Sequence, residues 1–454
     1  MRPMQNFGNI KKLSLALSAT FLVGAAGAAD LLQVYRQALD SDPLFQSARF
    51  TQDAGREKES QGLAGLLPTI GVSGNTQWND VDREIRGSSA PKLNAKYNSN
   101  AYSATLTQPL FRWQNVVTYQ QGKMQAAQAD AQFAQARQDL ILRVAQAYFD
   151  VLLAEENLRS IQAQQLAVGQ QLEQAKKNFE VGTATIVDSL EAQSRFDLGA
   201  AQEIAAVSDL EIKRRALEVI IGKDPGALAQ VRPKVQLDPP QPMVMKTWVD
   251  QAEADSIQVQ QQQLALEIAA KQVESNRAGH YPTLDAVVTR GNAAQTAALP
   301  TLGGGISPGF ETNSTTAALQ LNIPLFQGGL VNSKTREAAA NRDAARQQLE
   351  AARRNAAQAA RTAFLGVTNG TAQVNALRAA LVSSQSSLES NKLGYEVGVR
   401  INIDVLNAEQ QVYITRRDLA RVFHDTLLSQ LKLKAAVGTL EETDLAKINA
   451  LLQQ

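Results

Sequence analysis

The chain has 454 residues with 45 basic and 44 acidic side chains, so its charge is nearly balanced. This balance, together with the lack of any basic cluster, excludes a field that would recruit nucleic acid. Aromatic residues make up only 5% of the chain and cysteine is absent, which excludes disulfides and a lipidated cysteine and favours long helices packed on small side chains.

Residues 1–29 have the pattern of an export signal. Basic residues precede an apolar run over residues 13–26, and small residues follow it. The alternative is a membrane anchor, but the apolar run of about 14 residues is shorter than the ~20 that span a bilayer. We therefore expect cleavage after Ala28 or Ala29 and no transmembrane helix in the mature chain.

The rest of the chain consists of two similar sequence repeats. The string Phe-Glu-Val-Gly at 179–182 matches Tyr-Glu-Val-Gly at 395–398, and Leu-Thr-Gln-Pro-Leu-Phe at 106–111 matches Leu-Asn-Ile-Pro-Leu-Phe at 321–326. A nearly constant offset over such distances indicates duplication. The predicted units are a first repeat over 30–225, a Pro-rich linker over 226–244, a second repeat over 245–440 and a C-terminal tail over 441–454.

Each repeat contains two predicted strands, over 68–78 and 98–110 and over 283–291 and 313–324. In the second of them Tyr102, Ala104 and Leu106 alternate with hydroxyl residues, and about ten such residues cross a bilayer when tilted. Polar loops over 79–97 and 292–312 suit exposed hairpin tips. Four strands cannot close a barrel, so either other copies complete it or the strands form soluble hairpins in water. The pattern alone leaves both possibilities open.

A long helical hairpin follows each pair of strands. Proline is absent from 110–224 and from 325–454, and a seam with steps of four and three residues over 140–179 is apolar at all positions except Gln165. We expect helices from about residue 115 or 331 to turns at Gly182 and Gly398, about 65 residues or about 100 Å long. Return helices follow over 183–221 and 402–437.

These features, in order and in a duplicated frame, resemble the TolC family of outer-membrane efflux and type I secretion channel proteins. The resemblance covers nearly all of the mature chain. It rests on the segments 31–35, 105–111, 140–149 and 435–440, and on both Val-Gly turns with the Asp-x-Leu that follows each.

The resemblance implies a mostly α fold with membrane β structure. Duplicated long helical hairpins form a periplasmic α-barrel, and four strands per chain contribute to a 12-stranded barrel of a homotrimer in the lipid of the cell outer membrane. It also implies an exit duct that takes proteins or small molecules from an inner-membrane transporter (ABC, RND or MFS type) and a periplasmic adaptor. No cofactor is expected, and the adaptor is expected to dock at the turns of Gly182 and Gly398.

The same resemblance implies a gate at the periplasmic tip. Asp188 matches an acidic residue that hydrogen-bonds a tyrosine of the other half, here Tyr395, and Arg400 matches an arginine that reaches the neighbouring subunit near this aspartate. Asp404 matches a constriction ring of carboxylates. Asn407 departs from the family pattern, because it stands where the best-known member has a second ring of aspartates.

Other classes of protein are less well supported. The chain has only His280 and His424, in different halves, and the glycine segment 303–305 lacks the Lys-Ser/Thr sequel of a phosphate loop. We therefore expect neither catalysis nor a metal site. A periplasmic adaptor normally has one helical hairpin flanked by β-domains, and a soluble coiled-coil scaffold is the third alternative.

Overall fold

The computed structural model describes residues 28–84, 86–87, 92–183, 185–232, 235–297 and 308–453. The basic and apolar parts of the predicted export signal and the segment 303–305 lie outside them. The helices are α1 (Leu31–Ser41), α2 (Pro43–Ala64), α3 (Trp113–Glu180), α4 (Ile186–Ile221), α5 (Met245–Asp255), α6 (Ile257–Arg277), the 3-10 helix η1 (Ala278–His280), α7 (Leu330–Glu396), α8 (Asn402–Ala436) and α9 (Glu442–Asn449). The strands are β1 (Thr69–Arg83), β2 (Leu93–Phe111), β3 (Thr283–Ala297) and β4 (Pro308–Asn322).

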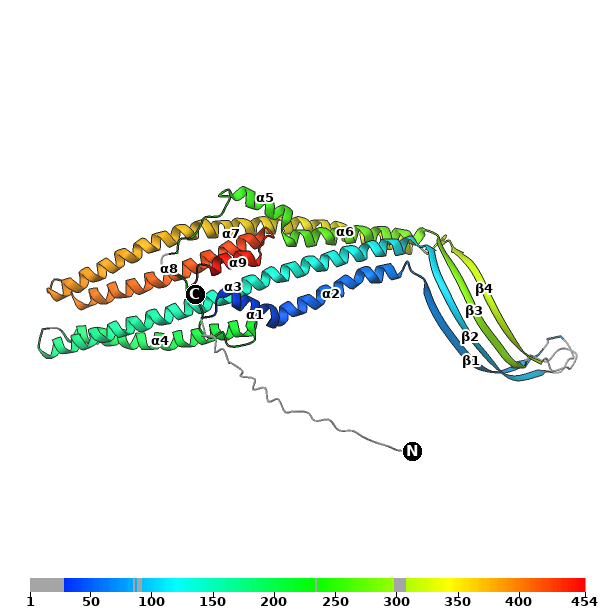
Figure 1. Ribbon diagram of the computed structural model, residues 1–454, viewed down its shortest axis with the longest axis horizontal. Coiled ribbons are helices and arrows are strands. Elements are labelled where there is room, and N and C mark those ends of the chain that lie inside the picture. Colours follow the sequence, from blue (N-terminus) through cyan, green and yellow to red (C-terminus); the bar gives the residue numbers. More distant parts are fainter. Residues whose placement is uncertain are drawn as a thin grey trace, which may run out of the picture.

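Two long helical hairpins, α3 with α4 and α7 with α8, form most of the molecule (Figure 1). The predicted hairpins are confirmed, and Leu140, Val144 and Val151 of the predicted seam are fully buried. α4 begins at Ile186 rather than at 183 because Thr185 caps it. None of the described helices combines the length and apolar character needed to cross a membrane.

The four strands form one antiparallel sheet in the order β1-β2-β3-β4, at the end of the molecule opposite the hairpin turns (Figure 1). β2 belongs to the first half of the chain and β3 to the second, so their pairing joins the two halves. β1 and β4 are the edge strands. Within the described chain each of these two strands pairs with one neighbour only.

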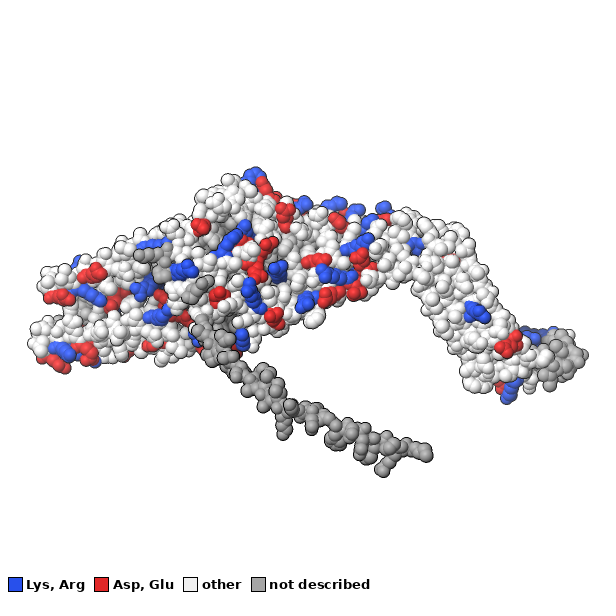
Figure 2. Space-filling model, viewed as in Figure 1, with Lys and Arg blue, Asp and Glu red and all other residues white. Residues whose placement is uncertain are grey.

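The two faces of the sheet differ in polarity. The register aligns Ile70 with Leu106 and Leu106 with Val288, so one face is apolar over these residues, and Arg290 and Asn292 lie further out on the same face. The other face carries hydroxyl pairs, such as Thr105 and Thr289 with their Oγ1 atoms 3.2 Å apart. Ile70 is 74% exposed in the single chain, and Figure 2 shows few charged residues on the sheet before its far end. The apolar face therefore lacks a cover within one chain.

The strands are longer than the alternation predicts, so the predicted loops 79–97 and 292–312 are wrong in extent. β1 continues to Arg83 and pairs throughout with β2, which begins at Leu93. Polar residues occur on both faces at the outer ends of these strands, as in Asn79 opposite Tyr97 on one face and in the ion pair of Lys96 with Asp80 at 3.0 Å on the other. Alternation of apolar and polar residues is lost there, although the backbone ladder continues.

An ion pair between the half-exposed Arg112 and the buried Asp285 connects the sheet to the start of α3. Arg112, between β2 and α3, donates to both carboxylate oxygens of Asp285 in β3, at 2.8 and 2.5 Å. Asp285 is 6% exposed. A two-point guanidinium–carboxylate contact restricts orientation as well as distance, so this pair helps to set the direction in which the helices leave the sheet.

A core at mid-length holds the two hairpins together. α1, α9 and linker residues such as Leu228, Ala229 and Leu237 pack there around α3 and α8. The buried hydroxyl of Tyr148 in α3 donates to the carbonyl oxygens of Ala229 at 2.7 Å and Ala29 at 3.2 Å. Burial raises the pKa of Tyr148, so the hydroxyl stays protonated and able to donate. The segment 441–454, expected as a tail, contains α9.

Candidate functional site

Both hairpin turns lie at the end of the molecule far from the sheet (Figure 1). Gly182 ends the first long helix with φ +77° and Gly398 ends the second with φ +79°. This left-handed conformation favours glycine and closes a helix end. The N–H groups of Gly182 and Gly398 donate to the carbonyls of Phe179 at 3.0 Å and Tyr395 at 3.1 Å. The two turns thus have the same local geometry.

Asp188 completes the capping box at the start of α4, the helix that Thr185 caps. Its backbone N–H donates to Thr185 Oγ1 at 3.3 Å, and its Oδ2 accepts from the Thr185 N–H at 3.1 Å and from the Thr185 hydroxyl at 2.7 Å. A carboxylate in the first turn of a helix is also favoured by the helix dipole. Within the described chain, Asp188 makes these contacts with Thr185 and none with Tyr395.

Within the single chain, Tyr395 and Arg400 contact residues other than Asp188. The Tyr395 hydroxyl in α7 accepts from Asn178 Nδ2 in α3 at 3.2 Å, so this bond connects the two hairpins near their tips. Arg400 lies 3.6 Å from Asp404, one turn further along. This pair is partly exposed, so it contributes little by itself. Roles of these residues in a gate stay a prediction.

Asn407 is bound by an arginine that sequence reasoning missed. Arg195 of α4 donates to Asn407 Oδ1 at 2.8 Å and to Gln410 Oε1 at 3.1 Å, both on α8. It also lies 3.4 Å from Glu191 on its own helix. Arg195 therefore forms a second polar connection between the hairpins. Nothing in its local sequence distinguishes it from the other arginines of the helices.

A buried carboxylate, also missed from the sequence, lies between the hairpins. Glu409 of α8 has a side chain 4% exposed, and one of its oxygens is 3.6 Å from Lys392 Nζ of α7. The other oxygen has no hydrogen-bond partner among the described residues. Burial raises the pKa of Glu409, and Lys392 opposes this effect. In the sequence, Glu409 could have been found from its position on the apolar stripe of α8, because the buried Val405 and Val412 lie on either side of it.

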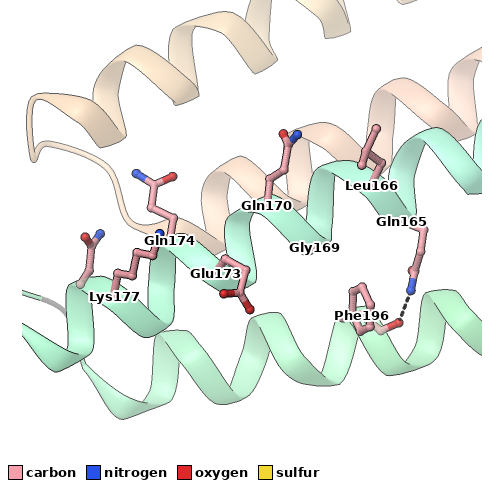
Figure 3. Close-up of a pocket in the computed structure, with 9 residues that line it drawn as sticks. Gln165, Leu166, Gly169, Gln170, Glu173, Gln174, Lys177 and Phe196 are labelled. Atoms are coloured by element: carbon pink, nitrogen blue, oxygen red, sulfur yellow. Dashed lines mark hydrogen bonds between the residues drawn. The ribbon is translucent and has the colours of Figure 1, made fainter.

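Glu409 lines a cavity of about 180 Å³ in which Tyr395 also takes part. Glutamines of α3, among them Gln170 and Gln174, form its opposite wall. The same two glutamines line a larger groove of about 680 Å³ along α3, where they extend from the helix toward the second hairpin (Figure 3). Gln165 of this groove instead donates to the Phe196 carbonyl of α4 at 3.0 Å. The seam between the hairpins is therefore polar near the tips.

The two histidines lie in different halves of the chain and differ in their exposure to solvent. His280 is exposed and its Nε2 lies 3.2 Å from Asn332 Oδ1, whereas His424 is buried on α8. Among the described residues, no three His, Cys, Asp or Glu side chains are grouped so that they could hold a metal ion.

Comparisons with known proteins agree on one family. The family model for outer membrane efflux proteins matches residues 34–223 and 248–439. The chain is 32% identical to the outer membrane protein TolC of Vibrio cholerae over 97% of this chain and 98% of that protein. It is 31% identical to the alkaline protease secretion protein AprF of Pseudomonas aeruginosa over 94% of this chain and 88% of that protein.

The fold has solved counterparts too. The Campylobacter jejuni CmeC outer membrane channel superposes with a TM-score of 0.78 at 16% identity, over 100% of this chain and 98% of that one. The similarity of sequence extends through both halves and that of fold through the whole chain. The chain therefore belongs to the outer membrane efflux protein family.

Proposed function

We propose that three copies of this outer-membrane protein form an exit duct for efflux or type I secretion. A periplasmic adaptor and an inner-membrane transporter deliver the substrate, and the helical hairpins carry it through the periplasm. The duct binds and passes its cargo without a catalytic step. Membership of the efflux family and similarity to a protease secretion protein support this function.

The observation that carries the proposal is the incomplete sheet. β1 and β4 each leave one row of backbone N–H and C=O groups unpaired within the described chain, and such an edge is very unfavourable in lipid. Pairing β4 of one copy with β1 of the next removes every edge once the ring closes. Three copies supply twelve strands, an even number as in bacterial outer-membrane barrels. The apolar face then meets lipid and the hydroxyl face lines the duct.

The helices support association of copies as well. α4 exposes apolar side chains along its length in the single chain, including Leu198 at 59%, Ile204 at 71% and Val207 at 50%. A neighbouring hairpin would cover them, which stabilises association by about 25 cal/mol per Å² of buried apolar surface. We also propose the repeat boundaries 30–225 and 245–440 with the linker 226–244 between them. The two segments matched by the family model lie inside these repeats.

The tips are the proposed gate and docking site. Asp188, Tyr395 and Arg400 form the latch, Asp404 forms a ring of three carboxylates with Asn407 next to it, and the turns at Gly182 and Gly398 meet the adaptor. Bonds such as that of Tyr395 with Asn178 are worth about 1 kcal/mol each, and threefold symmetry multiplies them. Adaptor binding opens the duct if it favours the open state by more than this sum.

The assembly is testable with the purified full-length protein. We expect extraction from outer membranes only with detergent, a trimer by mass photometry, and stepwise conductance in planar bilayers. A periplasmic adaptor or a soluble scaffold would instead appear in the periplasmic extract and give no conductance steps. Either of those results, or a monomer in detergent, would contradict the proposal.

Replacing Asn407 by Asp is expected to tighten blockade of the duct by multivalent cations, because it adds three carboxylates beside the Asp404 ring. The guanidinium of Arg195, 2.8 Å from the Asn407 side chain, will compensate part of this charge. We therefore expect a modest effect for Asn407→Asp and about tenfold tighter blockade for Asn407→Asp with Arg195→Gln, about 1.4 kcal/mol. Titration of single channels with a trivalent cation measures it. Equal blockade in the unmodified protein and in both variants would contradict the placement of Asn407 beside the proposed Asp404 ring.

A further inference from the structure

A second cavity lies at mid-length between the two hairpins, away from the tips. It has a volume of about 310 Å³, and its walls come from four segments: α3, the linker, α7 and α8. Each segment contributes one arginine to the lining, namely Arg159, Arg232, Arg378 and Arg416. The single acidic residue in the lining is Glu156. Four cations from four separate segments thus line one partly enclosed space.

Most of this charge has no carboxylate partner. Arg159 pairs with Glu156 at 3.3 Å and also donates to Gln230 Oε1 at 2.9 Å. In the part of the chain that the structure describes, the other arginines of the lining form no ion pair. An excess of guanidinium charge in a partly enclosed site attracts anions, because the field there is less screened than on an open surface.

Two of the arginines are held in place by backbone carbonyls. Arg232 Nε donates to the carbonyl of Leu452 at 2.8 Å, and Arg378 donates to the carbonyl of Val235. Because a guanidinium has five N–H donors, each keeps donors for a ligand. Arg416 makes no side-chain hydrogen bond or ion pair with any described residue. The site therefore combines fixed donors with one free guanidinium.

The inner wall of the cavity includes an unsatisfied buried histidine. His424 is 8% exposed, and its ring stacks on Phe149 with centroids 5.2 Å apart. Burial lowers the pKa of His424 to about 4, so the imidazole is neutral at neutral pH. Its Nδ1 has no hydrogen-bond partner among the described residues. A neutral imidazole adds an N–H donor without adding another like charge.

We propose that this cavity binds a compact oxyanion, either a free phosphate-like ion or a phosphate group carried on a small molecule. The planar guanidinium fork matches the oxygens of such groups. The volume is about ten times the roughly 30 Å³ that one water occupies in the liquid, so a phosphate with a small organic part fits. A bound anion would connect α3, α7, α8 and the linker, and would stabilise the junction of the two hairpins. This site does not depend on the proposed gate.

Calorimetric titration of the full-length protein in detergent tests the site. The probes are inorganic phosphate and glycerol 3-phosphate at constant ionic strength, and Arg416→Gln is the main variant because Arg416 supports no described contact. We expect saturable binding that Arg416→Gln weakens about tenfold. Tighter binding of the ester than of the free ion would assign the natural ligand to the small-molecule class, and the reverse would assign it to the free ion.

A charge-matched variant separates the site from general salt effects, because phosphate also stabilises proteins by exclusion from their surface. Arg353→Gln removes an exposed arginine of α7 remote from the cavity in sequence. It should leave the affinity unchanged. Equal affinity of Arg416→Gln and Arg353→Gln, or no saturable binding of either probe to the unmodified protein, would overturn the proposal.

Discussion

Replacing Tyr395 by Phe together with Arg400 by Ser is expected to raise the single-channel conductance of the proposed trimer severalfold. The Tyr395 hydroxyl accepts from Asn178 across the two hairpins at 3.2 Å, and Arg400 is proposed to reach the neighbouring copy. At about 1 kcal/mol per hydrogen bond, loss of these links in three copies removes several kcal/mol. This is comparable with the about 5.5 kcal/mol that moves an equilibrium from 1:99 to 99:1. Planar-bilayer recordings measure the change.

A matched pair of substitutions on the same hairpin, further from the tip, provides the control. Tyr413→Phe with Arg421→Ser makes the same chemical changes on α8, where Arg421 is 3.8 Å from Asp425 on its own helix. Conductance should stay at the unmodified level in this variant. If the tip variant also stays at that level, the latch assignment is wrong.

The two possible partners of Tyr395 can also be separated. Asn178→Leu removes the bond that the structure shows, and Asp188→Asn weakens the one that the family resemblance implied. Combined with Tyr395→Phe, each forms a double-mutant cycle, in which a true partner gives a non-additive effect on the open-to-closed ratio. We expect coupling with Asn178 in the closed duct.

The long helices were predictable because their signals repeat. The absence of proline from 110–224 and the apolar seam over 140–179 each act over many turns, so no single residue decides the outcome. The strands were predictable only where one face is apolar. Beyond Trp78 the ladder continues through Asn79 and Asp80, whose polar side chains give no period of two.

The polar contacts between the hairpins could not be predicted in the same way. Asn178 and Tyr395 are 217 residues apart, and their bond depends on how two helices pack, which no local pattern specifies. The arginine cavity has the same origin, since its charges come from four segments. The capping box of Thr185 with Asp188 is local, and its Thr-x-x-Asp spacing was available in the sequence.

The conductance of the proposed duct is also expected to rise with pH, through Glu409. In the structure, which we take as the closed state of the proposed gate, this carboxyl is buried in the cavity between the hairpins, and burial raises its pKa above the ordinary value of 4.5. Separation of the hairpins would expose the carboxyl to water and return its pKa toward that value. The closed state therefore binds the proton more tightly. The free energy by which Glu409 favours the closed state is fully present below pH 4.5, and it is lost as the pH rises through the raised pKa.

The charged and titratable groups that face Glu409 do not reverse this direction. Lys392 of α7 favours the ionised form but is 49% exposed and thus screened. Glu396 of α7 and Tyr395 share the cavity, and α3 contributes only glutamines and an alanine to it. On α8 itself, burial raises the pKa of Tyr413, and Glu409 adds to that effect. Among these groups, Glu409 is the buried acid, and its carboxyl takes up a proton at a higher pH than an exposed glutamate does.

Glu409→Gln, which cannot ionise, should therefore remove most of the pH dependence. For the unmodified protein we expect the open-to-closed ratio to rise between pH 5 and pH 8, because the raised pKa of Glu409 favours the protonated form in the proposed closed state. The matched variant Glu396→Gln removes an exposed carboxyl from the same cavity and should keep the full dependence. If Glu409→Gln and Glu396→Gln follow the same pH profile, the pH dependence comes from groups other than Glu409. A profile lost only in Glu409→Gln means that a buried carboxyl between the hairpins makes opening sensitive to the acidity of the periplasm.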